Sequence, residues 1–190
     1  MSGAALKYPP VAVAAALAVL SVYGQFKTPD KPVPSSNVDL AYGTEVSFGA
    51  GGNAEPFQVS GWSETETQFT WTEGTSAVLA MRVSPTTDRV MLRMKLAGLT
   101  KDPELPFQPV EVYVNDRKVA DWQVAKPAGF SAAIPQEMTR HGGLLRITLK
   151  IPKAASPKAL KMSVDPRVLG VQCSDLRLVI EGYPAGIHLS

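Results

Sequence analysis

A regular alternation of apolar and polar side chains constrains the fold of this chain more than any other feature of its sequence. In residues 89–99 (RVMLRMKLAGL), apolar residues recur at every second position, and Arg93 and Lys95 lie between them. Successive side chains of a β-strand point to opposite faces, so this run predicts an antiparallel strand with one buried and one solvated face. An amphipathic helix would need a period of 3.6 residues, which this run lacks.

The same period of two recurs through most of the chain after residue 40. We expect four further strands, at residues 40–48, 76–83, 143–152 and 175–182. Short strands separated by turns rich in proline, glycine and asparagine are typical of antiparallel sandwiches. With roughly seven or eight strands in all, the sequence predicts an all-β fold, an antiparallel β-sandwich of the jelly-roll kind.

Residues 110–124 (VEVYVNDRKVADWQV) predict a β-hairpin. Asn115 and Asp116 separate two alternating runs, and both tolerate the left-handed backbone of a tight turn. Calcium would need several converging oxygen atoms, so we interpret this pair as turn chemistry. Trp122, on the return strand, is expected to pack and to show one edge to a possible ligand. Residues 134–143 allow one short turn of helix.

The N-terminal part of the chain predicts a membrane segment. No charged residue occurs from Tyr8 to Phe26, and at 1.5 Å per residue this stretch would form about 28 Å of helix, close to the roughly 30 Å of a hydrocarbon core. We therefore expect residues 1–26 to be a single transmembrane anchor that contacts the bilayer through residues 9–26. A cleaved signal peptide is the alternative.

The remaining organisation follows from this anchor. Residues 27–39 are rich in proline and predict an extended linker. Residues 40–183 then form the sandwich, and residues 184–190 form a C-terminal tail. The short segment before the anchor favours export of the sandwich, so we expect a single-pass protein of a bacterial inner membrane with its globular domain in the periplasm.

Composition argues against several functions. The chain has 19 basic and 17 acidic residues, without basic runs, so we expect no nucleic-acid partner. Its single cysteine, Cys173, lies in an apolar run where burial is expected. With two histidines and one cysteine, a zinc site of the usual kind is not expected, and neither is a cofactor.

Two tryptophans bracket two acids in the most distinctive run of the sequence. Trp62 and Trp71 enclose Glu64 and Glu66, and Glu73 follows. An aromatic face can stack on the apolar face of a pyranose ring, and paired carboxylates can act as acid and base in a glycosidase. Alternatively, both tryptophans belong to the core, and the acids are solvated or paired with arginine. Sequence alone leaves the three interpretations open.

The run Asp165-Pro166-Arg167 predicts a structural corner before the last strand. An aspartate before proline favours an Asx-type turn, and a guanidinium group matches a carboxylate. We expect Arg167 to form a buried or half-buried ion pair with a carboxylate from the Trp62–Glu73 region, with Glu64 or Glu66 as the natural partner, and we count Asp165 in the same group of charges. A binding role for Arg167 is the alternative. A catalytic Asp–Arg pair would need a nucleophile or a metal, and neither is evident.

Three runs carry a resemblance to a known family: Gly61-Trp62 with the acids and Trp71 that follow; Val112 to Asn115; and Ser156-Pro157 through Asp165-Pro166-Arg167 to Leu169-Gly170. Together they resemble the β-sandwich accessory module of bacterial membrane and polysaccharide-assembly proteins, which is often attached to glycosyltransferases. The resemblance covers roughly residues 55–180. It implies a sandwich shaped like a carbohydrate-binding module, without a defined ligand.

The sequence therefore favours a membrane-anchored, exported and non-catalytic sandwich. It would bind glycan or dock on a partner in the cell envelope. Candidate binding residues are Trp62, Glu64, Glu66, Trp71, Trp122 and Arg167. The alternative is a structural accessory subunit of a larger membrane complex, with other membrane-protein subunits as partners and its alanine-rich helix packed in the bilayer. A hydrolase that uses Glu64 or Glu66 is a third possibility.

Overall fold

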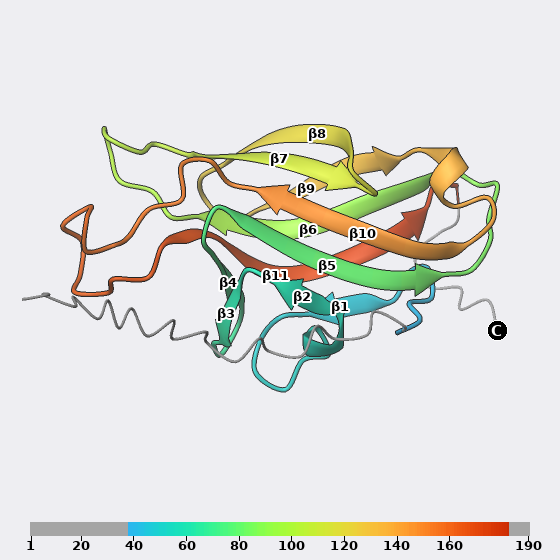
Figure 1. Ribbon diagram of the computed structural model, residues 1–190, viewed down its shortest axis with the longest axis horizontal. Helices are drawn as coiled ribbons and strands as arrows, with labels where there is room; N and C mark the ends of the chain where they lie inside the picture. The colour runs from blue at the N-terminus through green and yellow to red at the C-terminus, as the bar shows by residue number, and fades with distance from the viewer. Residues whose placement is uncertain (1–37, 183–190) are drawn as a thin grey trace, which may run out of the picture. The chain divides into compact units, whose positions relative to one another are not determined.

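The computed structural model describes residues 38–182, which form a sandwich of two antiparallel β-sheets (Figure 1). The predicted anchor and almost all of the predicted linker fall on residues 1–37, and the predicted tail falls on residues 183–190. These expectations therefore lie outside the described residues. Among the helical turns of residues 38–182, none is long and apolar enough to cross a membrane.

Within residues 38–182, eleven strands make up the two sheets. In spatial order, the first sheet contains β3 (Trp62–Thr65), β4 (Thr70–Glu73), β11 (Leu169–Ile180), β6 (Val90–Gly98) and β9 (Ala128–Ile134), and β1 (Glu45–Ser47) also pairs with β11. The second sheet contains β2 (Gln58–Ser60), β5 (Ser76–Val83), β10 (Gly143–Lys150), β7 (Gln108–Val114) and β8 (Arg117–Val124). Two short 3-10 turns, η1 (Glu55–Phe57) and η2 (Gln136–Met138), lie in the connections.

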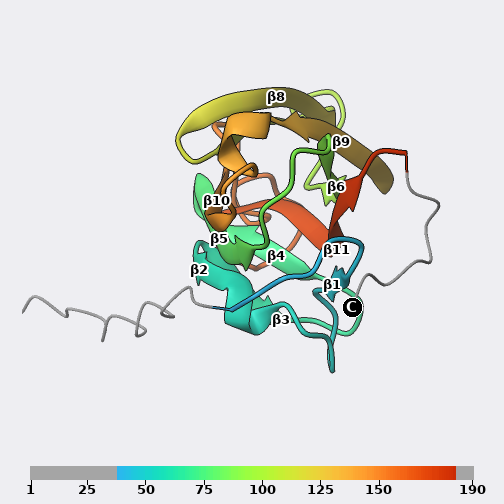
Figure 2. The same ribbon diagram turned by 90° about the vertical axis from the view of Figure 1, so that its right-hand side faces the viewer.

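The strand pairing is that of a long hairpin rolled into a sandwich. Strand β7 pairs with β8, β6 with β9, β5 with β10, and β4 with β11, all antiparallel. Successive pairs fall in alternate sheets, because β4, β6, β9 and β11 belong to the first and β5, β7, β8 and β10 to the second. This arrangement is the jelly-roll order that the sequence predicted. Figure 2 shows the two layers from the end, with β10, β5 and β2 opposite β9, β6 and β11.

The alternation in β6 has the predicted effect on burial. Its inward residues are at most 2% exposed: Val90, Leu92, Met94 and Leu96. Arg93 and Lys95 point to the opposite, solvated face of the first sheet. The core between the sheets gathers Leu, Ile, Val and Met side chains of both layers, and burial of this apolar surface is the main source of stability.

The β7–β8 hairpin turns at Asn115 and Asp116 as predicted. Their φ angles are 44° and 65°, the left-handed conformation that favours a two-residue turn. The Asn115 side chain also joins this turn to β10, because its Oδ1 accepts the Arg146 N–H at 2.8 Å and its Nδ2 donates to the Leu144 carbonyl. The pair is therefore turn chemistry that also fixes a neighbouring strand.

Some strands differ from the prediction. Only Glu45–Ser47 of the expected strand at residues 40–48 is a strand, because Gly43 has a φ of +85° and the segment turns there. Strand β9 was missed, because its sequence AGFSAAI consists mostly of small residues with little alternation in hydropathy. The short strands β2, β3 and β4 were missed as well, and each has only three or four residues.

Candidate functional site

The predicted corner, Asp165-Pro166-Arg167, lies next to the end of β4 in the fold. The Gly74 N–H donates to the Val168 carbonyl at 2.7 Å, and the Val171 N–H donates to Thr72 Oγ1 at 3.0 Å. These bonds join β4 to the start of β11. The first and third runs of the family resemblance, far apart in the sequence, are therefore neighbours in the fold.

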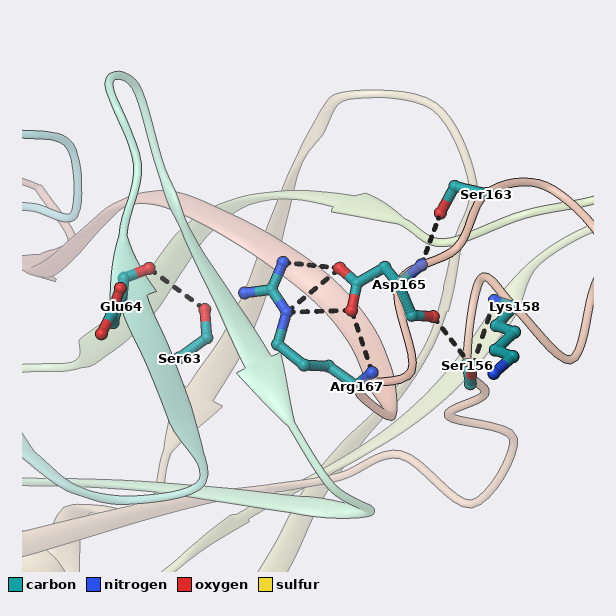
Figure 3. Close-up of polar contacts among 7 residues, drawn as sticks. All are labelled: Ser63, Glu64, Ser156, Lys158, Ser163, Asp165 and Arg167. Atoms are coloured by element: carbon teal, nitrogen blue, oxygen red, sulfur yellow. Dashed lines mark hydrogen bonds and ion pairs between the residues drawn. The ribbon is translucent and has the colours of Figure 1, made fainter.

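Hydrogen bonds of the Ser156 side chain and of the backbone order the connection from residue 156 to residue 168. Ser156 Oγ accepts the N–H groups of Lys158 and Ala159, and its hydroxyl donates to the Asp165 carbonyl at 3.1 Å. The Lys158 N–H donates to the same carbonyl at 2.9 Å. The bonds tie both ends of this loop together and fix the position of Asp165 (Figure 3).

Asp165 and Arg167 form a local ion pair. Asp165 Oδ1 accepts the Arg167 backbone N–H at 2.9 Å, which is the predicted Asx-type turn, and Oδ2 accepts from Arg167 Nη2 at 2.7 Å. Hydrogen bonds from the guanidinium group, and then from the backbone N–H, lower the pKa of Asp165. The same side-chain bond raises the pKa of Arg167, with smaller contributions from Glu73 and Glu66.

The expected ion pair between Arg167 and Glu64 or Glu66 is therefore wrong. Arg167 pairs with the neighbouring Asp165, and within residues 38–182 it makes no ion pair with Glu64 or Glu66. Figure 3 shows the guanidinium group bonded to Asp165, whereas the bond drawn at Glu64 runs from the Ser63 hydroxyl to the Glu64 backbone carbonyl. A carboxylate two residues away needs no long-range closure to reach the guanidinium, which favours the local partner.

This pair predicts a pH-dependent contribution to stability, testable with Asp165→Asn. Because the folded-state pKa of Asp165 is lowered, its contribution is fully present above the ordinary value of 3.8 and is lost as the pH falls through the folded-state pKa. We expect the gap in unfolding free energy between wild type and variant to be constant at neutral pH and to close below about pH 4. Urea unfolding across a pH series measures this gap, and a gap independent of pH would contradict the assignment.

Two of the three tryptophans are packing residues. Trp62 is half-buried, its Nε1 donates to the Val78 carbonyl at 2.9 Å, and its ring lies 5.1 Å from that of Phe48. Trp122 is only 8% exposed, and its ring centroid lies 5.5 Å from that of Phe130, with the two rings tilted by 36°. The expectation that Trp122 packs is confirmed. The expectation that it shows an edge to a ligand is wrong, because its ring belongs to the core.

The described residues hold few candidates for catalysis. Cys173 is fully buried, as expected, and burial raises the pKa of its thiol well above the ordinary value. In residues 38–182, no group of three or more His, Cys, Asp or Glu side chains is placed to hold a metal ion. Glu64 is exposed and Glu66 is half-buried.

The third tryptophan lies on the outer face of the first sheet, the face turned away from the core. Trp71 of β4 is half-buried, like Trp62, and aligns with Gln172 of β11, which aligns with Ala97 of β6. Cross-strand partners share a face, so these three side chains form one row. The neighbouring row along β11 and β6 contains Asp175 and Lys95, and it continues to Gly129 of β9.

A hollow of about 430 Å³ opens on the same outer face, over β6, β9 and β11. Its lining residues are Arg93, Met94, Lys95, Gly129, Phe130, Ser131 and Asp175. The hollow exists because β9 carries Gly129 and Ser131 on this face, beside the long side chains of Arg93 and Lys95 on β6. A Cβ atom added at Gly129 would meet no atom within 4 Å.

Sequence reasoning named Trp71 but missed the hollow beside it. Arg93 and Lys95 were recognised as solvent-facing, and their position two residues apart was the available signal. The missing element was β9, because only its pairing with β6 brings Gly129 and Ser131 next to the two cations.

Comparisons with known proteins find likeness in structure alone. No protein-family model and no curated protein sequence matches the chain. A family 36 carbohydrate-binding module of a xylanase from the hindgut metagenome of Trinervitermes trinervoides matches 76% of this chain and 98% of its own, with 11% identity and a TM-score of 0.42. The xylan-binding domain of a Paenibacillus barcinonensis protein matches 77% and 99%, with 10% identity and a TM-score of 0.43.

A Podospora anserina mannanase with a family 35 carbohydrate-binding module is also similar. The match covers 74% of this chain and 28% of that one, with 10% identity and a TM-score of 0.46. With TM-scores below 0.5, these likenesses carry no argument about the ligand of this chain.

Proposed function

We propose that residues 38–182 are a non-catalytic module that binds a glycan across the outer face of the first sheet. The observation that carries this proposal is the shared face of Trp71 and the hollow, which lie in neighbouring rows of the β4–β11–β6–β9 ladder. An aromatic ring and a polar hollow, set side by side on a hydrogen-bonded sheet, suit adjacent residues of an extended ligand.

The ladder fixes the relative positions of these groups before a ligand arrives. Gln172 and Asp175 align with Ala97 and Lys95, which are two residues apart on β6, or about 7 Å at 3.3 Å per residue. Trp71 and the hollow are therefore held a fixed distance apart by strand geometry. Little backbone or loop ordering is needed on binding, because all of these residues lie on hydrogen-bonded strands.

A binding role fits the chemistry of this face better than catalysis does. The outer-face residues near the hollow are two cations, one carboxylate and one serine. A glycosidase would need two carboxyl groups facing the same bond, whereas Asp175 is the one carboxylate among the residues that line the hollow. We therefore include the absence of hydrolytic activity in the proposal.

We extend the proposal to the place where the module acts. The uncharged stretch from Tyr8 to Phe26 and the proline-rich linker after it support a module tethered to a bacterial inner membrane and exposed to the periplasm. A tether of this kind would hold the outer face near envelope glycans.

Replacement of Trp71 by alanine tests the binding role. Tryptophans that anchor interfaces commonly contribute 2 kcal/mol or more, so we expect glycan affinity to fall by roughly 30-fold or more. The assay is calorimetric titration of the full chain with a panel of soluble polysaccharides, in a detergent without a sugar headgroup. Trp71→Phe is the matched control and should retain most of the affinity, because it keeps an aromatic face.

Two outcomes of this titration would contradict the proposal. One is no binding to any glycan by a wild-type chain that melts cooperatively. The other is glycan binding that Trp71→Ala leaves unchanged, which would place the ligand elsewhere on the molecule.

A second candidate function rests on the loop between β10 and β11. Three apolar side chains in this ordered loop are exposed: Met162 at 48%, Val164 at 90% and Val168 at 39%. Exposed apolar groups held in a fixed position favour contact with a partner protein, which suits the accessory-subunit alternative. Co-purification in mild detergent separates the two: a stable partner lost in Val164→Ser would support docking, and a chain that purifies alone would oppose it.

A further inference from the structure

We propose that the hollow over β6, β9 and β11 selects an acidic sugar, a uronate, in the glycan that this face binds. Arg93 and Lys95 would hold the sugar carboxylate, and Asp175 would accept hydrogen bonds from ring hydroxyls. This inference rests on the proposed glycan-binding function and narrows its ligand class.

The two cations at the hollow are available to a ligand. No salt bridge among residues 38–182 involves Arg93 or Lys95. The neighbouring cation in the row of Arg93 is Arg177, which already pairs with Glu45 of β1. Arg177 is therefore paired with a carboxylate, whereas Arg93 and Lys95 lie beside the hollow with Asp175 as the one acid among its lining residues.

The position of these cations suits a single carboxylate. Arg93 and Lys95 are two residues apart on β6, so both project from the same face along one wall of the hollow. A guanidinium group binds a carboxylate through parallel hydrogen bonds, and an ammonium group adds a point charge. Together they provide more positive charge than a neutral sugar needs.

Asp175 distinguishes a uronate from other anions. Its carboxylate lines the same hollow and aligns with Lys95 across the ladder. It would repel a phosphate or a polycarboxylate without hydroxyl groups, whereas it can accept hydrogen bonds from hydroxyls that lie next to the acid group of a sugar. A ligand that presents one carboxylate and adjacent hydroxyls satisfies all three charged residues.

The dimensions of the hollow are suitable for a bound sugar unit. Its volume of about 430 Å³ lies within the roughly 300–1,000 Å³ typical of small-molecule sites. The floor at Gly129 is open, since a Cβ atom there would meet nothing within 4 Å. A larger side chain at this position would therefore fill the hollow without displacing its neighbours.

The test compares two forms of one polysaccharide. The full chain, in a detergent without sugar headgroups, is titrated with polygalacturonate, with the same polymer after full methyl esterification, and with polyglutamate as a non-carbohydrate polyanion. We expect polygalacturonate to bind at least ten-fold more tightly than either of the others, and its affinity to fall as sodium chloride is raised.

Matched variants assign this preference to the hollow. The double variant Arg93→Gln/Lys95→Gln should lose at least ten-fold in affinity for polygalacturonate and little for the ester. Gly129→Leu should weaken binding of both while the melting temperature stays near that of wild type. The control Lys126→Gln/Arg146→Gln removes the same charge from exposed positions outside the hollow and should bind as wild type does.

The outcomes separate this inference from the function on which it rests. Equal binding of polygalacturonate and its ester would overturn the acidic-sugar inference and leave glycan binding intact. Equal binding of polyglutamate and polygalacturonate would also overturn it, because charge alone would then explain the affinity. If no glycan in the panel binds a folded chain, both the inference and the proposed function fail.

Discussion

The substitution Gly61→Ala is expected to destabilise the sandwich by about 2–5 kcal/mol. Gly61 has a φ of +74°, and a Cβ atom there would lie 2.0 Å from the Ser76 carbonyl oxygen and 2.8 Å from the Ala77 Cα. The penalty combines a left-handed backbone, which costs a residue other than glycine roughly 1–2 kcal/mol, with displacement of β5. This explains the glycine before Trp62 in the Gly-Trp motif, because β2 and β3 join here against β5.

Gly74→Ala is the matched control for this prediction. Gly74 has a φ of +86°, but a Cβ atom there would meet nothing within 4 Å, so only the backbone penalty of about 1–2 kcal/mol applies. Urea unfolding followed by tryptophan fluorescence measures both variants. Equal losses in the two variants would show that the close approach at Ser76 does not limit the residue at position 61.

Trp122→Ala is expected to cost about 3–5 kcal/mol, as other large aromatic truncations in cores do. The side chain is 8% exposed and its ring lies 5.5 Å from Phe130, so its removal leaves a cavity at the β8–β9 side of the core. At a temperature where the variant remains folded, its glycan affinity should match that of wild type, because Trp122 does not contribute to the outer face.

For Trp71→Ala we expect the reverse of the Trp122→Ala result, namely a large loss of glycan affinity and a small loss of stability. Trp71 is half-buried on the outer face and Trp122 is 8% exposed in the core, so Trp71→Ala should lose binding with a smaller loss of stability than Trp122→Ala. Thermal melts and titrations of both variants, side by side, distinguish the two roles. A Trp122→Ala chain that is fully stable but no longer binds glycan would return Trp122 to the site.

The sequence predicted the structure best where the pattern is local, as in the alternation along one strand or the residues of one turn. The alternation in β6 predicted which side chains are buried, and Asn115-Asp116 predicted the β7–β8 turn. It was least informative about partners that only the tertiary pairing brings together. Early and late strands do pair, as expected of a sandwich, since β4 lies beside β11. Even so, Arg167 pairs with Asp165 in its own turn.

The candidate site shows the same division between local and tertiary information. Trp62, Trp71 and Trp122 look alike in sequence, yet only Trp71 lies on the outer face in the row next to the hollow. The three tryptophans differ in which face of a sheet their side chains lie on, and that depends on how their strands pair. The hollow itself needs β9 beside β6, and the small residues of β9 gave too weak a pattern for its strand to be predicted.

Nuclear magnetic resonance mapping of a glycan titration tests the central claim most directly. The isotope-labelled full chain, in a detergent without sugar headgroups, is titrated with polygalacturonate fragments while backbone amide shifts are followed. The account predicts that the largest shifts cluster on the outer face of the first sheet, around Trp71, Gln172, Lys95 and Gly129. Shifts that cluster on the outer face of the second sheet or on the loop at residues 156–168, or no shifts at saturating glycan, would contradict it.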